Sequence, residues 1–176
     1  GYSSIHNSVS GNDITANNLD GVTLSNSNYN SIFGNNITAN QRDGVGLYLS
    51  SSFNSICRNN ITNNQYGIEL YGSSNHNIIY ENNIANNYRS IWLFESSFTS
   101  VYHNNFVNNT KRVATLDSVL NVWDNRYPSG GNYWSDHTDV DLNSGSYQNV
   151  TGSDGIWDHP YVINEDNRDN YPLTEP

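Results

Sequence analysis

Short blocks of sequence recur about every 23 residues from the start of the chain to about residue 109. The triplet at Asn12–Ile14 returns at Asn35–Ile37, Asn59–Ile61, Asn82–Ile84 and Asn104–Phe106, with its apolar residues 23, 24, 23 and 22 residues apart. A second block recurs in phase at Gly21–Leu24, Gly44–Leu47, Gly67–Leu70 and Ser90–Leu93. Self-similarity at this period is the mark of a solenoid, in which each repeat packs on its neighbours.

The pattern inside each block favours strands over helices. Val22 and Leu24 are separated by one polar residue, as are their equivalents in later repeats, and this period of two places each pair on one face of a strand. No window shows apolar residues at helical spacing. We therefore predict an all-β fold, a right-handed parallel β-helix of roughly six coils with about 23 residues per coil.

Asparagine also recurs in phase with the strands. Two columns are Asn12, Asn35, Asn59, Asn82 and Asn104, and Asn17, Asn40, Asn64, Asn87 and Asn109. Asn tolerates the left-handed backbone that a tight corner needs, and its amide can donate and accept along a stack. These columns predict ladders of hydrogen-bonded amides at the corners.

The repeat fades after Asn109, and the character of the sequence changes after Trp123. Residues 124–176 are rich in loops, aromatic side chains and acids. A solenoid has to cover the end of its core, and these aromatic residues suit that role. We expect a single domain with repeats over 1–123 and a C-terminal capping tail over 124–176.

Sequence motifs in both parts resemble those of a known family. The repeat at Asn59–Leu70 reads NNITNNQYGIEL, and the tail contains GNYWSD at Gly131–Asp136, DGIWDHPY at Asp154–Tyr161 and DNYPL at Asp169–Leu173. This combination resembles the NosD-like parallel β-helix repeat proteins, also described as carbohydrate-binding and sugar-hydrolysis domains and abundant in archaeal surface proteins. The resemblance covers essentially the whole chain and implies the β-helix fold more firmly than any activity.

Composition excludes several classes of partner. Seven Lys and Arg against 17 Asp and Glu give a formal net charge of −10, which argues against nucleic acid. No apolar run is long enough for membrane insertion. The chain begins at Gly1 and contains no Met, which predicts a processed, secreted or cell-surface product. The single cysteine, Cys57, is predicted to pack inside the helix.

Acidic residues cluster in the tail, where related sequences carry a run that resembles a calcium loop. Calcium takes six to eight oxygen ligands, and closely spaced aspartates supply several from one turn. The candidate calcium ligands are Asp136, Asp139, Asp141, Asp154 and Asp158. Solvated loop carboxylates are the alternative. Copper is a weaker candidate, because the five histidines are scattered and His6 and His76 share a column with aromatic residues.

Four sequons for N-glycosylation are present, at Asn36, Asn60, Asn108 and Asn149. A separate column of outward positions carries aromatic side chains suited to stacking on a sugar or a partner. These residues are Tyr48, Tyr71, Trp92 and Phe94. Alternatively, such a stripe protects the sheet or lies beneath the returning tail.

Catalytic residues are not assigned from the sequence. A β-helix hydrolase needs two or three carboxylates in one groove. Asp20 and Asp43 share a position in successive coils, where like charges would raise a pKa. Two corner carboxylates also suit a turn, and the expected protein is non-catalytic.

The sequence as a whole predicts an extracellular structural or adhesive module that assembles head to tail into a filament, tube or surface layer. The first coil starts partway through a repeat and exposes strand edges, so either upstream coils belong to a longer protein or another subunit covers the edge, and the homopolymer is the expectation. A glycan is the other expected partner. The alternatives are a carbohydrate-binding or polysaccharide-degrading β-helix and a periplasmic-type copper-handling protein.

Overall fold

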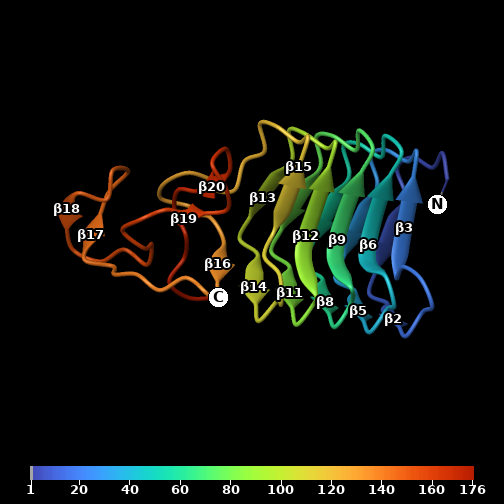
Figure 1. Ribbon diagram of the computed structural model, residues 1–176, viewed down its shortest axis with the longest axis horizontal. Coiled ribbons are helices and arrows are strands. Elements are labelled where there is room, and N and C mark those ends of the chain that lie inside the picture. Colours follow the sequence, from blue (N-terminus) through green and yellow to red (C-terminus); the bar gives the residue numbers. More distant parts are fainter. Residues whose placement is uncertain (1) are drawn as a thin grey trace.

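The computed structural model describes residues 2–176 and is a parallel β-helix, as predicted (Figure 1). Three parallel sheets run the length of the stack, and no helix is present in residues 2–176. One sheet contains β1 (Ser8–Ser10), β4 (Ser31–Phe33), β7 (Ser55–Cys57), β10 (Ile78–Tyr80) and β13 (Ser100–Tyr102). The second contains β2 (Asp13–Thr15), β5 (Asn36–Thr38), β8 (Asn60–Thr62), β11 (Asn83–Ala85), β14 (Asn105–Val107) and β16 (Tyr133–Trp134). The third contains β3 (Val22–Ser25), β6 (Asp43–Tyr48), β9 (Tyr66–Tyr71), β12 (Arg89–Phe94) and β15 (Ala114–Leu116).

The sequence repeat sets the register of the strands. Ile37 pairs with Ile14 on one side and with Ile61 on the other, so equivalent residues of successive repeats stack directly. Two sheets have five strands and the third has six. The β-helix therefore has about five turns. Six coils were expected from the sequence, and β16 is the only strand of the sixth.

The core is a column of aliphatic side chains. Ile37, Ile61 and Ile84 from one sheet and Leu47, Leu70 and Leu93 from another have no exposed surface. At the far end Phe106 stacks on Trp134, with ring centroids 4.2 Å apart, and Trp134 stacks on Tyr161 at 4.1 Å. The tail thus continues the core and closes it with aromatic rings.

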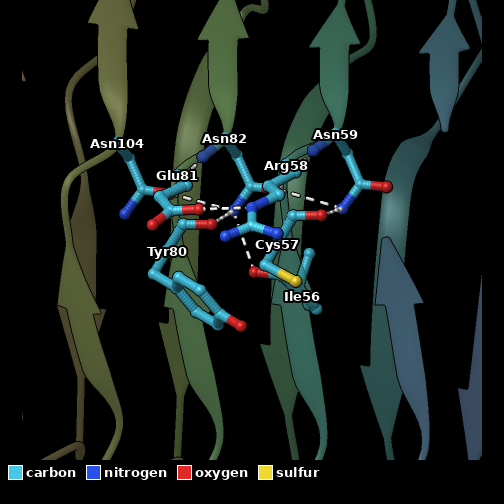
Figure 2. Close-up of polar contacts among 8 residues, drawn as sticks. All are labelled: Ile56, Cys57, Arg58, Asn59, Tyr80, Glu81, Asn82 and Asn104. Carbon is cyan, nitrogen blue, oxygen red and sulfur yellow. Dashed lines mark hydrogen bonds and ion pairs between the residues drawn. The ribbon is translucent and has the colours of Figure 1, made fainter. Parts of the chain in front are cut away.

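The amide ladders are confirmed, and Figure 2 shows one of them. The Asn59 amide donates to Asn82 Oδ1 at 3.0 Å, and the Asn82 amide donates to Asn104 Oδ1 at 2.9 Å. Each amide also donates to backbone carbonyls, as Asn59 Nδ2 does to Cys57 O and Ile32 O at 2.9 Å. The ladder asparagines of the middle coils are buried, and their hydrogen bonds are satisfied inside the corner, which makes them structural rather than ligand-binding.

The left-handed corner residue is the one before each ladder asparagine, which corrects the expectation from sequence. Arg58, Glu81 and His103 have φ of 55°, 54° and 53°, whereas the asparagines that follow them do not have positive φ. The corner residue turns its own side chain outward, as Arg58 does in its ion pair with Glu81 (Figure 2). The next side chain can then point inward and join the ladder.

A third amide ladder was missed, although its spacing is visible in the sequence. It runs through Asn7, Asn30, Asn54 and Asn77, in which each of the first three amides donates to the asparagine of the next coil. The residues before these asparagines form the expected aromatic column: His6, Tyr29, Phe53, His76 and Phe98 stack with centroids 4.8 to 5.4 Å apart.

The tail is attached through Asp169, the first residue of its closing motif. Asp169 Oδ2 accepts from the backbone N–H of Asn132 at 2.7 Å and from Trp134 Nε1 at 2.9 Å. Asn132 in turn ends the ladder by accepting from Asn104 Nδ2 at 3.0 Å. A Cβ on Gly131 would lie 1.9 Å from Asp169 Oδ1, so only glycine fits there. The motifs at Gly131–Asp136 and Asp169–Leu173 therefore meet in one hydrogen-bonded junction.

The rest of the tail forms two small antiparallel ribbons, which lie beyond the stack in Figure 1. These are β17 (Asn143–Ser144) with β18 (Val150–Thr151), and β19 (Tyr161–Val162) with β20 (Arg168–Asp169). Residues of the predicted tail thus add one strand, β16, to the stack. The division into repeats over 1–123 and a capping tail over 124–176 remains a prediction. No helix of residues 2–176 is long and apolar enough to cross a membrane.

Replacing Asn59 by Ala is expected to destabilise the protein by about 2–4 kcal/mol. The change removes the hydrogen bonds that Asn59 donates to the carbonyls of Ile32 and Cys57 and leaves the buried N–H of Asn35 without its acceptor. An unsatisfied buried group of this kind costs about 1–3 kcal/mol. Asn60→Ala is the matched control, because Asn60 is the adjacent residue, is exposed, and its amide makes only exposed hydrogen bonds, to Asn36 Oδ1 and from Asn83 Nδ2. Chemical denaturation of both variants measures the difference, and equal losses would show that the buried ladder is not the stabilising element.

Candidate functional site

The sheet of β3, β6, β9, β12 and β15 shows one break in its repeat. The outward position in the middle of each strand is occupied in register by Thr23, Gly46, Glu69, Trp92 and Ala114. Gly46 is the only one of these without a side chain, so the sheet surface is hollow at that point.

Tyr48 folds back into this hollow. A Cβ on Gly46 would lie 2.4 Å from Tyr48 Oη and 2.5 Å from the ring, so the ring occupies the space that a side chain would fill. Tyr48 Oη donates to Asp43 Oδ2, accepts from Arg42 Nη2 at 2.5 Å and lies 3.2 Å from Glu69 Oε2. The phenol therefore links a buried carboxyl to a carboxylate on the next coil.

This conformation changes the aromatic stripe expected from the sequence. Tyr71 and Phe94 stack with centroids 4.8 Å apart, and Trp92 lies 6.5 Å from Phe94. Tyr48 is paired in register with Tyr71 but leaves the stripe, because Gly46 lets it turn toward Asp43. Three of the four predicted residues form the stripe, and Tyr48 belongs to the polar cluster beside it.

Arg42 neutralises part of this cluster. Its Nε lies 3.0 Å from Asp20 Oδ1 and 3.5 Å from Asp43 Oδ2, and its guanidinium lies 5.1 Å from the centroid of the Tyr48 ring. Asp20 also accepts a 2.7 Å hydrogen bond from Thr23. The stacked pair Asp20 and Asp43, noted in the sequence, is thus held together by a guanidinium from the same corner.

Asp43 is the most perturbed group of the cluster. Its side chain has no exposed surface, and its Oδ1 has no hydrogen-bond partner in residues 2–176. Burial raises the pKa of Asp43 to about 8, and the neighbouring Glu69 adds to the rise. A carboxyl with this pKa is mostly protonated at neutral pH. Strongly shifted carboxyls of this kind concentrate at functional sites.

A groove of about 850 Å³ lies over this cluster. Its polar lining includes Asp20, Arg42, Gln65 and Glu69, and its aromatic and aliphatic lining is Leu19, Tyr48, Leu49, Tyr66 and Tyr71. Small-molecule sites combine such apolar walls with a few convergent polar groups. We call this feature the sheet groove.

The candidate calcium ligands lie in the tail, and each is engaged by the protein. Asp136 pairs with Arg112 Nε at 2.5 Å, and Asp139 with His159 Nδ1 at 2.9 Å. The other three accept hydrogen bonds from nearby loops: Asp141 from the N–H of Asp154 and Gly155, Asp154 from Ile156, and Asp158 from Leu142 and Asn143. No cluster of three or more potential ligands for a metal is found in residues 2–176. Calcium binding by this set remains a prediction.

The potential copper ligands do not fit a copper site. His6 and His76 are in the aromatic column, and His159 is paired with Asp139. Cys57 is buried, and the chain contains no Met. Within residues 2–176, these side chains form no group of three or more that could hold a copper ion.

The sequon asparagines are placed on the outer surface. Asn60, Asn108 and Asn149 are exposed and Asn36 is half-buried. The amides of Asn36 and Asn60 also form an exterior ladder, in which Asn60 Nδ2 donates to Asn36 Oδ1 at 2.9 Å. Glycosylation at these four positions remains a prediction.

The fold and the family match define the class of protein as a parallel β-helix. The model of the NosD family, described as "Periplasmic copper-binding protein (NosD)", matches residues 2–139. Because the match extends over residues 2–139 of the 176, the chain belongs to the NosD family. No curated protein sequence matches the chain.

Solved structures with the same fold include the periplasmic alginate epimerase AlgG. One crystal structure of AlgG is 26% identical over 56% of this chain and 24% of that chain, with a TM-score of 0.53. A double mutant of AlgG is 24% identical over 76% of this chain and 29% of that chain, also with a TM-score of 0.53. The chain thus spans about a quarter to a third of the length of these proteins.

The raised pKa of Asp43 predicts a pH dependence of stability. The folded state favours the protonated carboxyl, so the associated stabilisation is complete below about pH 4 and is lost as the pH rises through about 8. Every tenfold difference in proton affinity between the folded and unfolded states corresponds to about 1.4 kcal/mol. Asp43→Asn should reduce the change of the unfolding free energy with pH between about pH 4 and pH 8. Denaturant unfolding at a series of pH values measures it.

Asp13→Asn is the control for this experiment, because Asp13 is exposed. This variant should leave the pH dependence of the unfolding free energy unchanged. Asp169, whose pKa burial raises to about 7, keeps its own contribution in both variants. An unaltered slope in the Asp43 variant would contradict a protonated Asp43.

Proposed function

We propose that this protein binds polysaccharide in the sheet groove over β3, β6 and β9. The observation that carries the proposal is the groove on this sheet, one wall of which is the Tyr48 ring that turns over Gly46 and leaves the stripe beside Tyr71. Tyr71 offers a ring that is 43% exposed and held in place by its stack on Phe94. Aromatic faces beside convergent polar groups are suited to sugar rings.

The comparisons support this choice of ligand class. AlgG, which shares the fold, is an epimerase of the polysaccharide alginate by its description. The descriptions of AlgG and of the NosD family both include the word periplasmic, which supports a location outside the cytoplasm. A structural or adhesive role at the cell surface is compatible with glycan binding. Because the potential ligands do not converge, we do not extend the copper binding of the family description to this chain.

Self-assembly into a homopolymer is a separate prediction from glycan binding. β1, β2 and β3 are the edge strands of their sheets, and Tyr2 pairs with Ser25 at the end of β3. An edge strand can template another strand, which is the basis of the proposed assembly. At the other end of the stack the tail is held through Asp169, Asn132 and Trp134.

Gly46→Thr is expected to weaken glycan binding at least tenfold while the fold is kept. Thr stands at the equivalent position of the preceding coil, so the strand tolerates it, but its Cβ would displace the Tyr48 ring from the wall of the groove. A glycan array screened with the wild-type protein identifies ligands, and calorimetry with the strongest one should show at least a tenfold loss.

Ala114→Thr is the matched control, because it places the same side chain at the same outward position outside the groove and should leave affinity within about twofold. Failure of the wild-type protein to bind any glycan, or equal affinity in both variants, would contradict the proposed function.

A further inference from the structure

The charges of the sheet groove do not suit a polyanionic glycan. Its charged lining consists of the carboxylates of Asp20 and Glu69 and the guanidinium of Arg42, which leaves one net negative charge. The whole chain carries a formal charge of −10. A uronate polymer would approach this groove against both the local and the overall charge.

Arg42, the one cation of the lining, is already used. Its Nε is shared by Asp20 at 3.0 Å and Asp43 at 3.5 Å, and its Nη2 donates to Tyr48 at 2.5 Å. Releasing the guanidinium to a sugar carboxylate would leave the largely buried carboxylate of Asp20 without its cation. The groove therefore lacks a free cation for an acidic sugar.

The nearest cations along the same column do not alter this. In register, Asp43 is followed by Tyr66, then Arg89 and then Lys111. Tyr66 lies between the groove cluster and Arg89, and the Arg89 guanidinium lies 5.2 Å from the centroid of the Trp92 ring. These cations belong to coils beyond the hollow.

Glu69, in contrast, has an unneutralised charge. It makes no ion pair in residues 2–176, and its carboxylate lies 3.2 Å from Tyr48 Oη. Glu69 and the exposed ring of Tyr71 are two residues apart on the same outward face of β9, a separation of roughly 7 Å. A carboxylate and an aromatic face at this spacing can hold the amine and the ring of one cationic sugar, because both attract a cation.

We propose that the sheet groove selects a glycan that carries protonated amines, a polymer of amino sugars, and that Glu69 binds the ammonium group while Tyr71 stacks on the sugar. This inference rests on the proposed function and names its ligand class. It separates this chain from AlgG, whose description names the acidic polysaccharide alginate.

The test compares three hexasaccharide probes by calorimetry at mildly acidic pH: chitosan, which carries amines, chitin, which is the neutral N-acetylated counterpart, and alginate, which carries carboxylates. The full chain should bind chitosan at least tenfold more tightly than alginate, with chitin between them. Glu69→Gln should weaken chitosan binding about tenfold and leave chitin binding within about twofold, because a charge-assisted hydrogen bond is lost. Added salt should weaken chitosan binding in the wild type more than in the variant.

Glu165→Gln is the matched control, because it removes the same charge from an exposed site in the tail. An equal loss of chitosan affinity in both variants would show that overall charge, not Glu69, sets the preference, and would overturn the inference. Alginate binding as tightly as chitosan would also overturn it and would leave the proposed function standing. Binding of none of the three probes, nor of any glycan on the array, would overturn both. Thermal melting of each variant establishes that the fold is intact.

Discussion

The structure depends on the buried amide ladders at its corners. Each ladder asparagine accepts from the preceding coil and donates to the following coil, so a shift of one residue in any coil would leave buried amides and carbonyls unpaired. This requirement holds every coil in register with its neighbours. As a consequence, outward positions are also aligned, and any difference between coils becomes a local feature of a regular surface.

The candidate site arises from such a difference. In the column of Thr23, Gly46 and Glu69 the side chain is missing in one coil only, and Tyr48 turns into the space. This conformation covers Asp43, raises its pKa by burial and leaves Glu69 as a carboxylate without a cationic partner beside Tyr71. The regular repeat provides a rigid support, and a single glycine lets Tyr48 leave the stripe and form one wall of the groove.

The period of the repeat was sufficient to predict the fold, the inward aliphatic residues and two amide ladders, because one spacing dictates all three. The left-handed residue was misplaced by one position, since the sequence does not show which side chain of the pair points inward. The position of the Tyr48 ring over Gly46 was not predicted, because it depends on the space above the glycine and on hydrogen-bond partners from more than one coil. The role of Asp169 was also not visible, since its partners Asn132 and Trp134 are about 35 residues away in the sequence.

The most direct test of the account is a crystal structure of the protein soaked with a chitosan oligosaccharide. We expect a sugar ring on the face of Tyr71, with its amine within hydrogen-bond distance of Glu69 and the Tyr48 ring still over Gly46. Sugar density confined to another surface, such as the aromatic column of Tyr29 and Phe53, would contradict the assignment of the groove.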